Sequence, residues 1–170
     1  MKILLIGNIG AGKTSIGSIL ADELKLPLVA MDDLRFRYSN GTIPGEYSAL
    51  YQFMLACNDQ NGCILEFSGV GCHKHSVKKA LEDSKKSVSV VTILSEIDVI
   101  KKRLKDKKWP PHPWSLDLDN ALLKIEKELK QDLDSRFWEN TLLNHKVVIL
   151  KNNQENNFDE IIKIIKQQLK

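Results

Sequence analysis

Short hydrophobic runs alternate along the chain with segments in which hydrophobic and polar positions follow helical spacing. The runs have the length of a strand and are at least partly β-branched: Lys2–Ile6, Pro27–Met31, Cys63–Phe67, Val88–Leu94 and Lys146–Leu150. Most show little alternation between hydrophobic and polar residues, which is typical of strands buried on both faces. The pattern therefore predicts five strands inside a covered sheet.

Further segments carry hydrophobic side chains that recur every three or four residues, as they do on one face of a helix. These side chains are Ile16, Ile19, Leu20 and Leu24; Tyr47, Leu50, Tyr51 and Met54; Leu118, Leu122, Ile125, Leu129 and Leu133; and Phe158, Ile161, Ile162, Ile165 and Leu169. Strands that alternate with helices predict βαβ units. We therefore expect a three-layer α/β fold, a five-stranded parallel sheet with helices on both faces. The carboxyl ends of its strands then lie along one edge, where such folds bind ligands.

Composition narrows the class of protein. The length of 170 residues fits one domain, which we expect to span residues 1–170. A net charge of +3 argues against a polybasic nucleic-acid binder. Three cysteines fit a reducing compartment and no hydrophobic stretch is long enough to cross a bilayer, so we predict a cytoplasmic protein with no membrane partner. Basic residues leading into a proline-rich stretch predict a surface excursion over about residues 101–116.

A phosphate-binding loop follows the first predicted strand. The residues from Gly7 to Thr14 match the pattern G-x-x-x-x-G-K-[ST], and a helix is predicted directly after them. In such a loop the backbone N–H groups point at phosphate oxygens, the lysine reaches the β- and γ-phosphates, and the hydroxyl coordinates Mg²⁺. We therefore expect ATP and Mg²⁺ as cofactors, with Thr14 as the metal ligand. The expected nucleotide-binding residues are Gly7, Asn8, Ile9, Gly10, Ala11, Gly12, Lys13, Thr14 and Ser15.

Two observations favour transfer of the phosphate to a second substrate over hydrolysis. A guanine-specific GTPase carries Asn-Lys-x-Asp after a late strand, where this chain has Lys151-Asn152-Asn153-Gln154. A motor or large ATPase needs a longer chain and usually a hydrophobic strand that ends in Asp, whereas the third run ends at Glu66 and Phe67. Transfer to a bound acceptor fits the small size of the chain better.

Two carboxylates and an arginine follow the second predicted strand, in the order Asp32-Asp33-Leu34-Arg35. Phosphoryl transfer uses a group that accepts or orients the proton of the acceptor hydroxyl, and a carboxylate at this edge serves that purpose. Arg35 lies three residues after Asp32, on the same side of a helical turn, and its guanidinium suits an anionic acceptor or the transferred phosphate. Alternatively, Asp32 only caps a helix that starts at Asp33.

These motifs together resemble small P-loop kinases, a group that includes shikimate and gluconate kinases, nucleoside monophosphate kinases and polynucleotide kinases. The Asp-Asp-x-Arg element is most similar to the polynucleotide-kinase branch, and this resemblance implies that Asp32 is the catalytic base and that Arg35 contacts the acceptor. Ser68-Gly69-Val70-Gly71 lies where shikimate kinases carry a glycine-rich acceptor loop, which implies that Gly69 and Gly71 bind the acceptor. Alternatively, these glycines only make a tight turn.

The same resemblance implies a lid after the fourth strand. Arg103 would be a catalytic cation of this lid, helped by lysines such as Lys105, Lys107 and Lys108, although a basic run of this kind is also typical of a solvated helix face. The leading hypothesis is an ATP-dependent kinase that uses Lys13, Asp32, Arg35 and Arg103. Its acceptor would be a hydroxyl or phosphate of a small molecule, such as a nucleoside, a nucleotide or another metabolite. The alternatives are a kinase acting on nucleic-acid 5′-hydroxyl ends and a non-catalytic, nucleotide-dependent binding protein.

Overall fold

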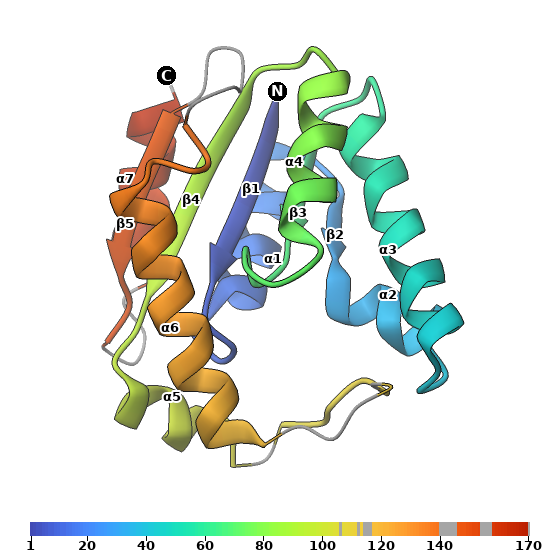
Figure 1. Ribbon diagram of the computed structural model, residues 1–170. Coiled ribbons are helices and arrows are strands. Elements are labelled where there is room, and N and C mark those ends of the chain that lie inside the picture. Colours follow the sequence, from blue (N-terminus) through green and yellow to red (C-terminus); the bar gives the residue numbers. More distant parts are fainter. Residues whose placement is uncertain (106, 112, 114–116, 140–145, 154–157, 170) are drawn as a thin grey trace.

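The sheet and its covering helices form three layers in the computed structural model, which describes residues 1–105, 107–111, 113, 117–139, 146–153 and 158–169. All pairings in the five-stranded sheet are parallel, and the strand order is β2-β3-β1-β4-β5 (Figure 1). The strands are β1 (Lys2–Gly7), β2 (Leu28–Ala30), β3 (Cys63–Glu66), β4 (Val88–Leu94) and β5 (Lys146–Lys151). The α/β class and the parallel sheet predicted from the hydrophobic pattern are confirmed.

Helices cover both faces of this sheet. They are α1 (Lys13–Leu24), α2 (Met31–Tyr38), α3 (Ile43–Asn58), α4 (Lys74–Asp83), α5 (Ile97–Arg103), α6 (Leu118–Asp134) and α7 (Phe158–Leu169). Helices α3, α4 and α6 pack on one face and α1 and α7 on the other, while α2 and α5 lie near the carboxyl ends of the strands (Figure 1). Loops from several strands therefore meet at one edge of the sheet.

Alternation along the strands divides the core into two clusters. In β1, Leu4 and Ile6 face the cluster beneath α3 and α4, whereas Ile3 and Leu5 face the cluster beneath α1 and α7. All four side chains are at most 1% exposed, so β1 is covered on both faces. This double burial explains why the strands read as continuous hydrophobic runs in the sequence.

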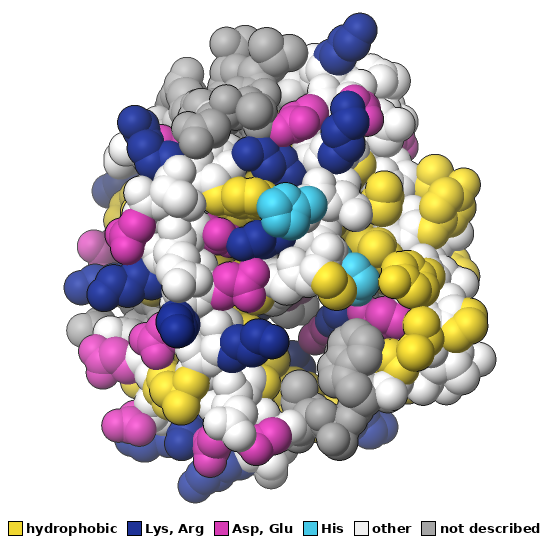
Figure 2. Space-filling model, viewed as in Figure 1, with side chains coloured by type: hydrophobic (Ala, Val, Ile, Leu, Met, Phe, Trp, Pro, Cys, Tyr) yellow, Lys and Arg dark blue, Asp and Glu magenta, His cyan; other side chains and the backbone are white. Residues whose placement is uncertain are grey.

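The strand boundaries lie within one residue of the predicted hydrophobic runs, and two neighbouring helices differ from the expected pattern. Helix α2 begins directly at Met31, so β2 is shorter than the run Pro27–Met31. Helix α3 forms as predicted and buries Leu50, but Tyr47 and Tyr51 are 62% and 59% exposed. The buried face is therefore shifted toward Ala49 and Phe53. Hydrophobic side chains gather on the surface over α3 (Figure 2). Among the described residues, no helix has the length and hydrophobicity needed to cross a membrane.

Candidate active site

The phosphate-binding loop connects β1 to α1 at the carboxyl edge of the sheet. Gly10 and Gly12 have φ angles of +75° and +95°, a region that favours glycine, and Gly12 is the N-cap of α1. Lys13 is folded back over the loop, where its Nζ atom donates to the carbonyl oxygens of Gly7 at 3.1 Å and Asn8 at 2.9 Å. Burial lowers the pKa of Lys13, although the charges of Glu66 and Asp32 oppose this effect. The ammonium group of Lys13 is thus held by backbone carbonyl oxygens of a loop that begins at the central strand.

Side chains from other elements brace this loop. Asn8 donates through Nδ2 to the carbonyl oxygen of Leu122 in α6, at 3.0 Å. Asn152, which follows β5 and is 1% exposed, donates through Nδ2 to the carbonyl oxygen of Ala11, at 2.8 Å. A Cβ atom added at Gly12, where φ is positive, would lie 2.4 Å from Asn152 Nδ2, so the glycine leaves room for the Asn152 side chain beside the loop. The curvature of the loop is therefore supported by contacts distant in sequence.

Glu66, the last residue of β3, faces the loop from the neighbouring strand. Its Oε2 atom accepts a hydrogen bond from Thr14 Oγ1 at 3.0 Å, and its Oε1 atom lies 3.8 Å from Lys13 Nζ. Hydroxyl and carboxylate oxygens are hard donors that fit Mg²⁺, which proteins usually hold by one or two such groups together with the phosphates of the nucleotide. Thr14 and Glu66 therefore fit the group that the motif implies. Among the described residues, no cluster of three or more His, Cys, Asp or Glu offers a metal site of another kind.

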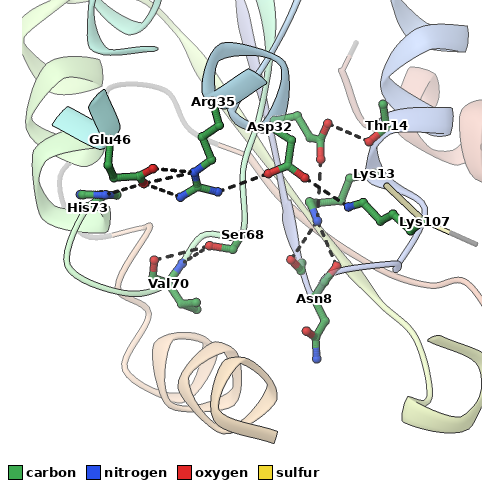
Figure 3. A network of polar contacts seen from close by, with 12 residues as sticks. Asn8, Lys13, Thr14, Asp32, Arg35, Glu46, Ser68, Val70, His73 and Lys107 are labelled. Atoms are coloured by element: carbon green, nitrogen blue, oxygen red, sulfur yellow. Dashed lines mark hydrogen bonds and ion pairs between the residues drawn. The ribbon is translucent and has the colours of Figure 1, made fainter. Parts of the chain in front are cut away.

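A chain of polar contacts runs from the loop to the far side of the edge (Figure 3). Asp32 Oδ1 accepts from Arg35 Nη1 at 3.2 Å, and Asp32 Oδ2 accepts from Lys107 Nζ at 3.1 Å. Arg35 also donates through Nε and Nη2 to the carboxylate of Glu46, with a shortest distance of 2.7 Å. His73 Nε2 lies 3.2 Å from Glu46 Oε1. Arg35 therefore joins two carboxylates, one exposed to the cleft and one buried in α3.

Asp32 does not act as the helix cap that was the alternative interpretation. Helix α2 starts at Met31, two residues earlier than that interpretation requires, and Ala30 occupies the N-cap with no side-chain hydrogen bond. Burial alone would raise the pKa of Asp32, but the charges of Lys107 and Arg35 outweigh it and hold the pKa below its ordinary value. Glu46 is only 3% exposed, and the hydrogen bonds from His73 and Arg35 overcome its burial and lower its pKa to about 2. Both carboxylates are therefore ionised at neutral pH.

Three adjoining clefts follow this edge. The phosphate groove, of about 290 Å³, is lined by the loop together with Glu66, Arg103, Lys107 and Phe158. The central cleft, of about 160 Å³, is lined by Ile9, Lys13, Met31, Asp32, Arg35, Glu66, Phe67, Ser68, Lys107, Trp109 and Ile125. The acceptor cleft, of about 400 Å³, is lined by Ile9, Arg35, Ser68, Val70, Gly71, Cys72, His73, Asp117, Asn120, Ala121, Lys124, Ile125 and Glu128. Shared lining residues make the three a continuous path.

The two glycines predicted to bind the acceptor have different surroundings. Gly69 has a φ angle of +84°, and a Cβ atom there would lie 2.6 Å from Cβ of Ile6, so this glycine allows a close approach to β1. Gly71 has a φ angle of +83° and lines the acceptor cleft, where its N–H donates to Glu128 Oε1 at 2.9 Å. Gly69 therefore has the position expected of a tight turn, and Gly71 the position expected of a cleft residue.

The basic segment after β4 contributes two side chains to the path. Arg103 lines the phosphate groove, and its Nη1 atom donates to the carbonyl oxygen of Asn152 at 3.1 Å. Lys107, rather than Lys105 or Lys108, reaches the central cleft, and its Nζ atom also lies 5.0 Å from the ring centroid of Trp109. Positions 106, 112 and 114–116 of the predicted excursion lie outside the described residues. The segment thus brings one cation to the groove and another to Asp32.

Sequence reasoning singled out Lys13, Thr14, Asp32, Arg35 and Gly71, and the structure brings all of them to one continuous path. Sequence reasoning assigned no site role to Glu46, Glu66, Glu128 or Asn152. For Glu66, its position at the end of a strand was the available signal, but sequence reasoning used it only to note that large ATPases usually have Asp there. The other three carried no local signal, because their partners are distant in the sequence.

Comparisons with known proteins bear on this arrangement. The model of the ATPase family associated with various cellular activities (AAA) matches residues 3–167. Comparison of the sequence with curated proteins finds no match. Among solved structures, shikimate kinase from Acinetobacter baumannii in complex with shikimate is 21% identical with a TM-score of 0.65, and the alignment covers 99% of this chain and 92% of that one.

Two further solved structures have the same fold. A sugar kinase from Janibacter sp. HTCC2649 is 17% identical with a TM-score of 0.63, over 99% of this chain and 93% of that one. A gluconokinase from Sinorhizobium meliloti 1021 is 16% identical with a TM-score of 0.58, over 99% of this chain and 93% of that one. At these identities the similarity is one of fold, the three-layer P-loop fold that small kinases adopt.

Proposed function

The chain belongs to the ATPase family associated with various cellular activities, and we propose that it is an ATP-dependent kinase that phosphorylates a small molecule. The observation that carries the proposal is the central cleft, where Asp32 and Lys13 face the same space between the phosphate groove and the acceptor cleft. An enzyme that only binds or hydrolyses ATP needs no second cleft beyond the γ-phosphate. The kinase folds of the structural neighbours agree with this proposal.

On the donor side, the backbone N–H groups of the loop and the ammonium group of Lys13 would bind the β- and γ-phosphates. When ATP enters, Lys13 exchanges the carbonyl oxygens of Gly7 and Asn8 for phosphate oxygens. Thr14, supported by Glu66, would hold Mg²⁺, which supplies charge neutralisation on the phosphates when bound. Arg103, at the rim of the groove, would bind near the nucleotide rather than at the acceptor.

On the acceptor side, Asp32 would accept the proton of the substrate hydroxyl. The oxygen of that hydroxyl would attack the γ-phosphorus, and ADP would leave. The ionised state of Asp32 that Lys107 and Arg35 favour is the state that this role requires. Arg35, fixed by Glu46, would orient both Asp32 and the acceptor. Lys107, which contacts Asp32, would move to the transferred phosphoryl group as charge develops on it, as lid cations do.

Hydrolysis of ATP is the second candidate function, and the position of Glu66 favours it. This carboxylate is 6% exposed, faces both Lys13 and Thr14, and lines the phosphate groove as well as the central cleft. A carboxylate so close to the γ-phosphate position can orient a water molecule instead of an acceptor hydroxyl. Membership of an ATPase family agrees with this alternative.

One assay distinguishes the two functions. Release of ADP is measured with ATP and Mg²⁺ alone and then with a library of metabolites, and phosphorylated products are identified by mass spectrometry. A kinase gives a phosphorylated product and ADP release that depends on the acceptor. Rapid release of inorganic phosphate without any acceptor would support hydrolysis instead. Lys13→Ala is the control, since it should lose both the turnover and the rise in melting temperature that ATP with Mg²⁺ gives the wild type.

A further inference from the structure

In the acceptor cleft, the positive charge that Arg35 would offer to an anionic substrate is already paired with carboxylates of the protein. Arg35 has five N–H groups, and three of them donate to protein carboxylates: Nε and one Nη2 hydrogen to Glu46, and one Nη1 hydrogen to Asp32. Glu46 is 3% exposed and its pKa is lowered to about 2, so its carboxylate is ionised at neutral pH. The positive charge of Arg35 is therefore neutralised before any acceptor arrives. Its other two N–H groups have no acceptor within the described part of the chain and remain for hydrogen bonds.

The second anion-binding group of the cleft is occupied in the same way. After a strand, a glycine N–H that faces a cleft is a natural donor to a carboxylate or phosphate. Here the N–H of Gly71 donates to Glu128 Oε1 at 2.9 Å. Glu128 is held in place from the other side by Lys74, whose Nζ atom lies 3.1 Å from the same oxygen and 2.7 Å from Asp132 Oδ1. Glu128 thus lies where the anionic group of an acidic acceptor would otherwise bind.

The charges that line the acceptor cleft balance. Its described lining carries two cations, Arg35 and Lys124, and two carboxylates, Asp117 and Glu128. Just behind the lining, Glu46 adds a third negative charge beside Arg35, and Lys74 adds a third positive charge beside Glu128. An anionic acceptor would bring a further negative charge beside Glu46 and Glu128, in a partly buried site where like charges repel more strongly than in water.

The groups that remain available suit hydroxyl groups, which both donate and accept hydrogen bonds. The two N–H groups of Arg35 can donate to hydroxyl oxygens, and the carboxylate oxygens of Asp32 and Glu128 can accept from hydroxyl hydrogens. Hydrophobic side chains in the lining of the cleft, Ile9, Val70, Ala121 and Ile125, would contact a carbon skeleton. The cleft therefore offers donors, acceptors and apolar contacts to one small molecule.

We propose that the acceptor is an uncharged polyhydroxyl compound, and not an organic acid or a phosphate ester. This inference rests on the proposed kinase function and narrows its substrate class. It also separates the chain from kinases of nucleic-acid 5′ ends, because a polynucleotide would bring its backbone phosphates to this balanced cleft. Specificity is assigned to Glu46 and Glu128, which exclude anions by occupying the donors that anions need.

The first experiment measures binding and needs no turnover. Isotopically labelled protein is saturated with ADP and Mg²⁺, so that the phosphate loop is filled, and is titrated to millimolar concentrations with gluconate or glycerol 3-phosphate. The amide resonances of Gly71 and Cys72 should not respond in the wild type or in Glu126→Ala, an exposed control on the same helix. In Glu128→Ala, which removes the carboxylate that accepts from the N–H of Gly71, both anions should shift these resonances.

Saturable binding of either anion at Gly71 in the wild type would overturn the proposal, and this result does not depend on the variant folding. Absence of any response in folded Glu128→Ala would also overturn it, because the released N–H would then not be the blocked anion site. The second experiment sorts the acceptors found by ADP release according to charge. Uncharged polyols as the preferred acceptors support the proposal, and acids or phosphate esters overturn it. If no compound of any charge is phosphorylated, the kinase function fails, and the binding experiment still decides the charge that the cleft accepts.

Discussion

Replacing Glu46 with Gln tests whether the buried pair with Arg35 holds the site together. The folded-state pKa of Glu46 is about 2, against an ordinary value of 4.5. Each pKa unit corresponds to about 1.4 kcal/mol, so the ionised carboxylate contributes about 3 kcal/mol to the free energy of unfolding at neutral pH. The side chain is only 3% exposed, and breaking a buried ion pair commonly costs about 3–5 kcal/mol. We therefore expect Glu46→Gln to lose about 3 kcal/mol near pH 7.

The loss should depend on pH in one direction. The pKa of Glu46 is depressed in the folded state, so its stabilising effect is fully present above about pH 4.5 and disappears as the pH falls toward about 2. A protonated Glu46 resembles Gln in shape and charge. The difference in unfolding free energy between wild type and Glu46→Gln should therefore shrink steadily over this window as the solution is acidified.

Urea unfolding, followed by tryptophan fluorescence at a series of pH values, measures this difference, since Trp138 is buried in the core. The control is Glu126→Gln, an exposed glutamate on α6, whose change should stay within about 0.5 kcal/mol at every pH. A loss at Glu46 that is the same at all pH values would refute the reasoning, because it would come from packing and not from the ionised pair. A loss below about 1 kcal/mol near pH 7 would equally refute it, since a pair solvated in solution contributes no more than that.

Two further comparisons use neighbouring residues as matched pairs. Asp32→Asn should lower turnover of the acceptor by about 100-fold or more with little change in nucleotide affinity, whereas Asp33→Asn, which is exposed, should have a much smaller effect; a larger loss at Asp33, measured by steady-state kinetics, would move the base by one residue. Gly69→Ala should destabilise the fold by about 1–3 kcal/mol more than Gly71→Ala, because both have a positive φ but only Gly69 lacks room for a Cβ atom. Equal melting temperatures for the two alanine variants would show that the turn adjusts.

Much of the architecture could be predicted from the sequence, because it rests on local patterns. Doubly buried strands leave continuous hydrophobic runs, and a phosphate-binding loop requires glycine and lysine at set spacings within a few residues. The loop from Gly7 to Ser15 and the Asp32–Arg35 element are therefore recognisable in the amino-acid sequence alone. The preference for transfer over hydrolysis, drawn from chain length and from Glu66 in place of Asp, stays a prediction, as do the assigned catalytic roles.

The environment of those residues was decided by tertiary structure. The sequence indicated that Arg35 suits an anionic acceptor or the transferred phosphate, but the fold brings Glu46 against its guanidinium from 11 positions away. Lys107 reaches Asp32 across 75 positions, and Glu128 meets the N–H of Gly71 across 57. Each of these is a single charged side chain on a helix or loop, indistinguishable in the sequence from a solvated one. The energy of such a pair depends on distance and burial, and both exist only once the parallel sheet has brought its loops and helices to one edge.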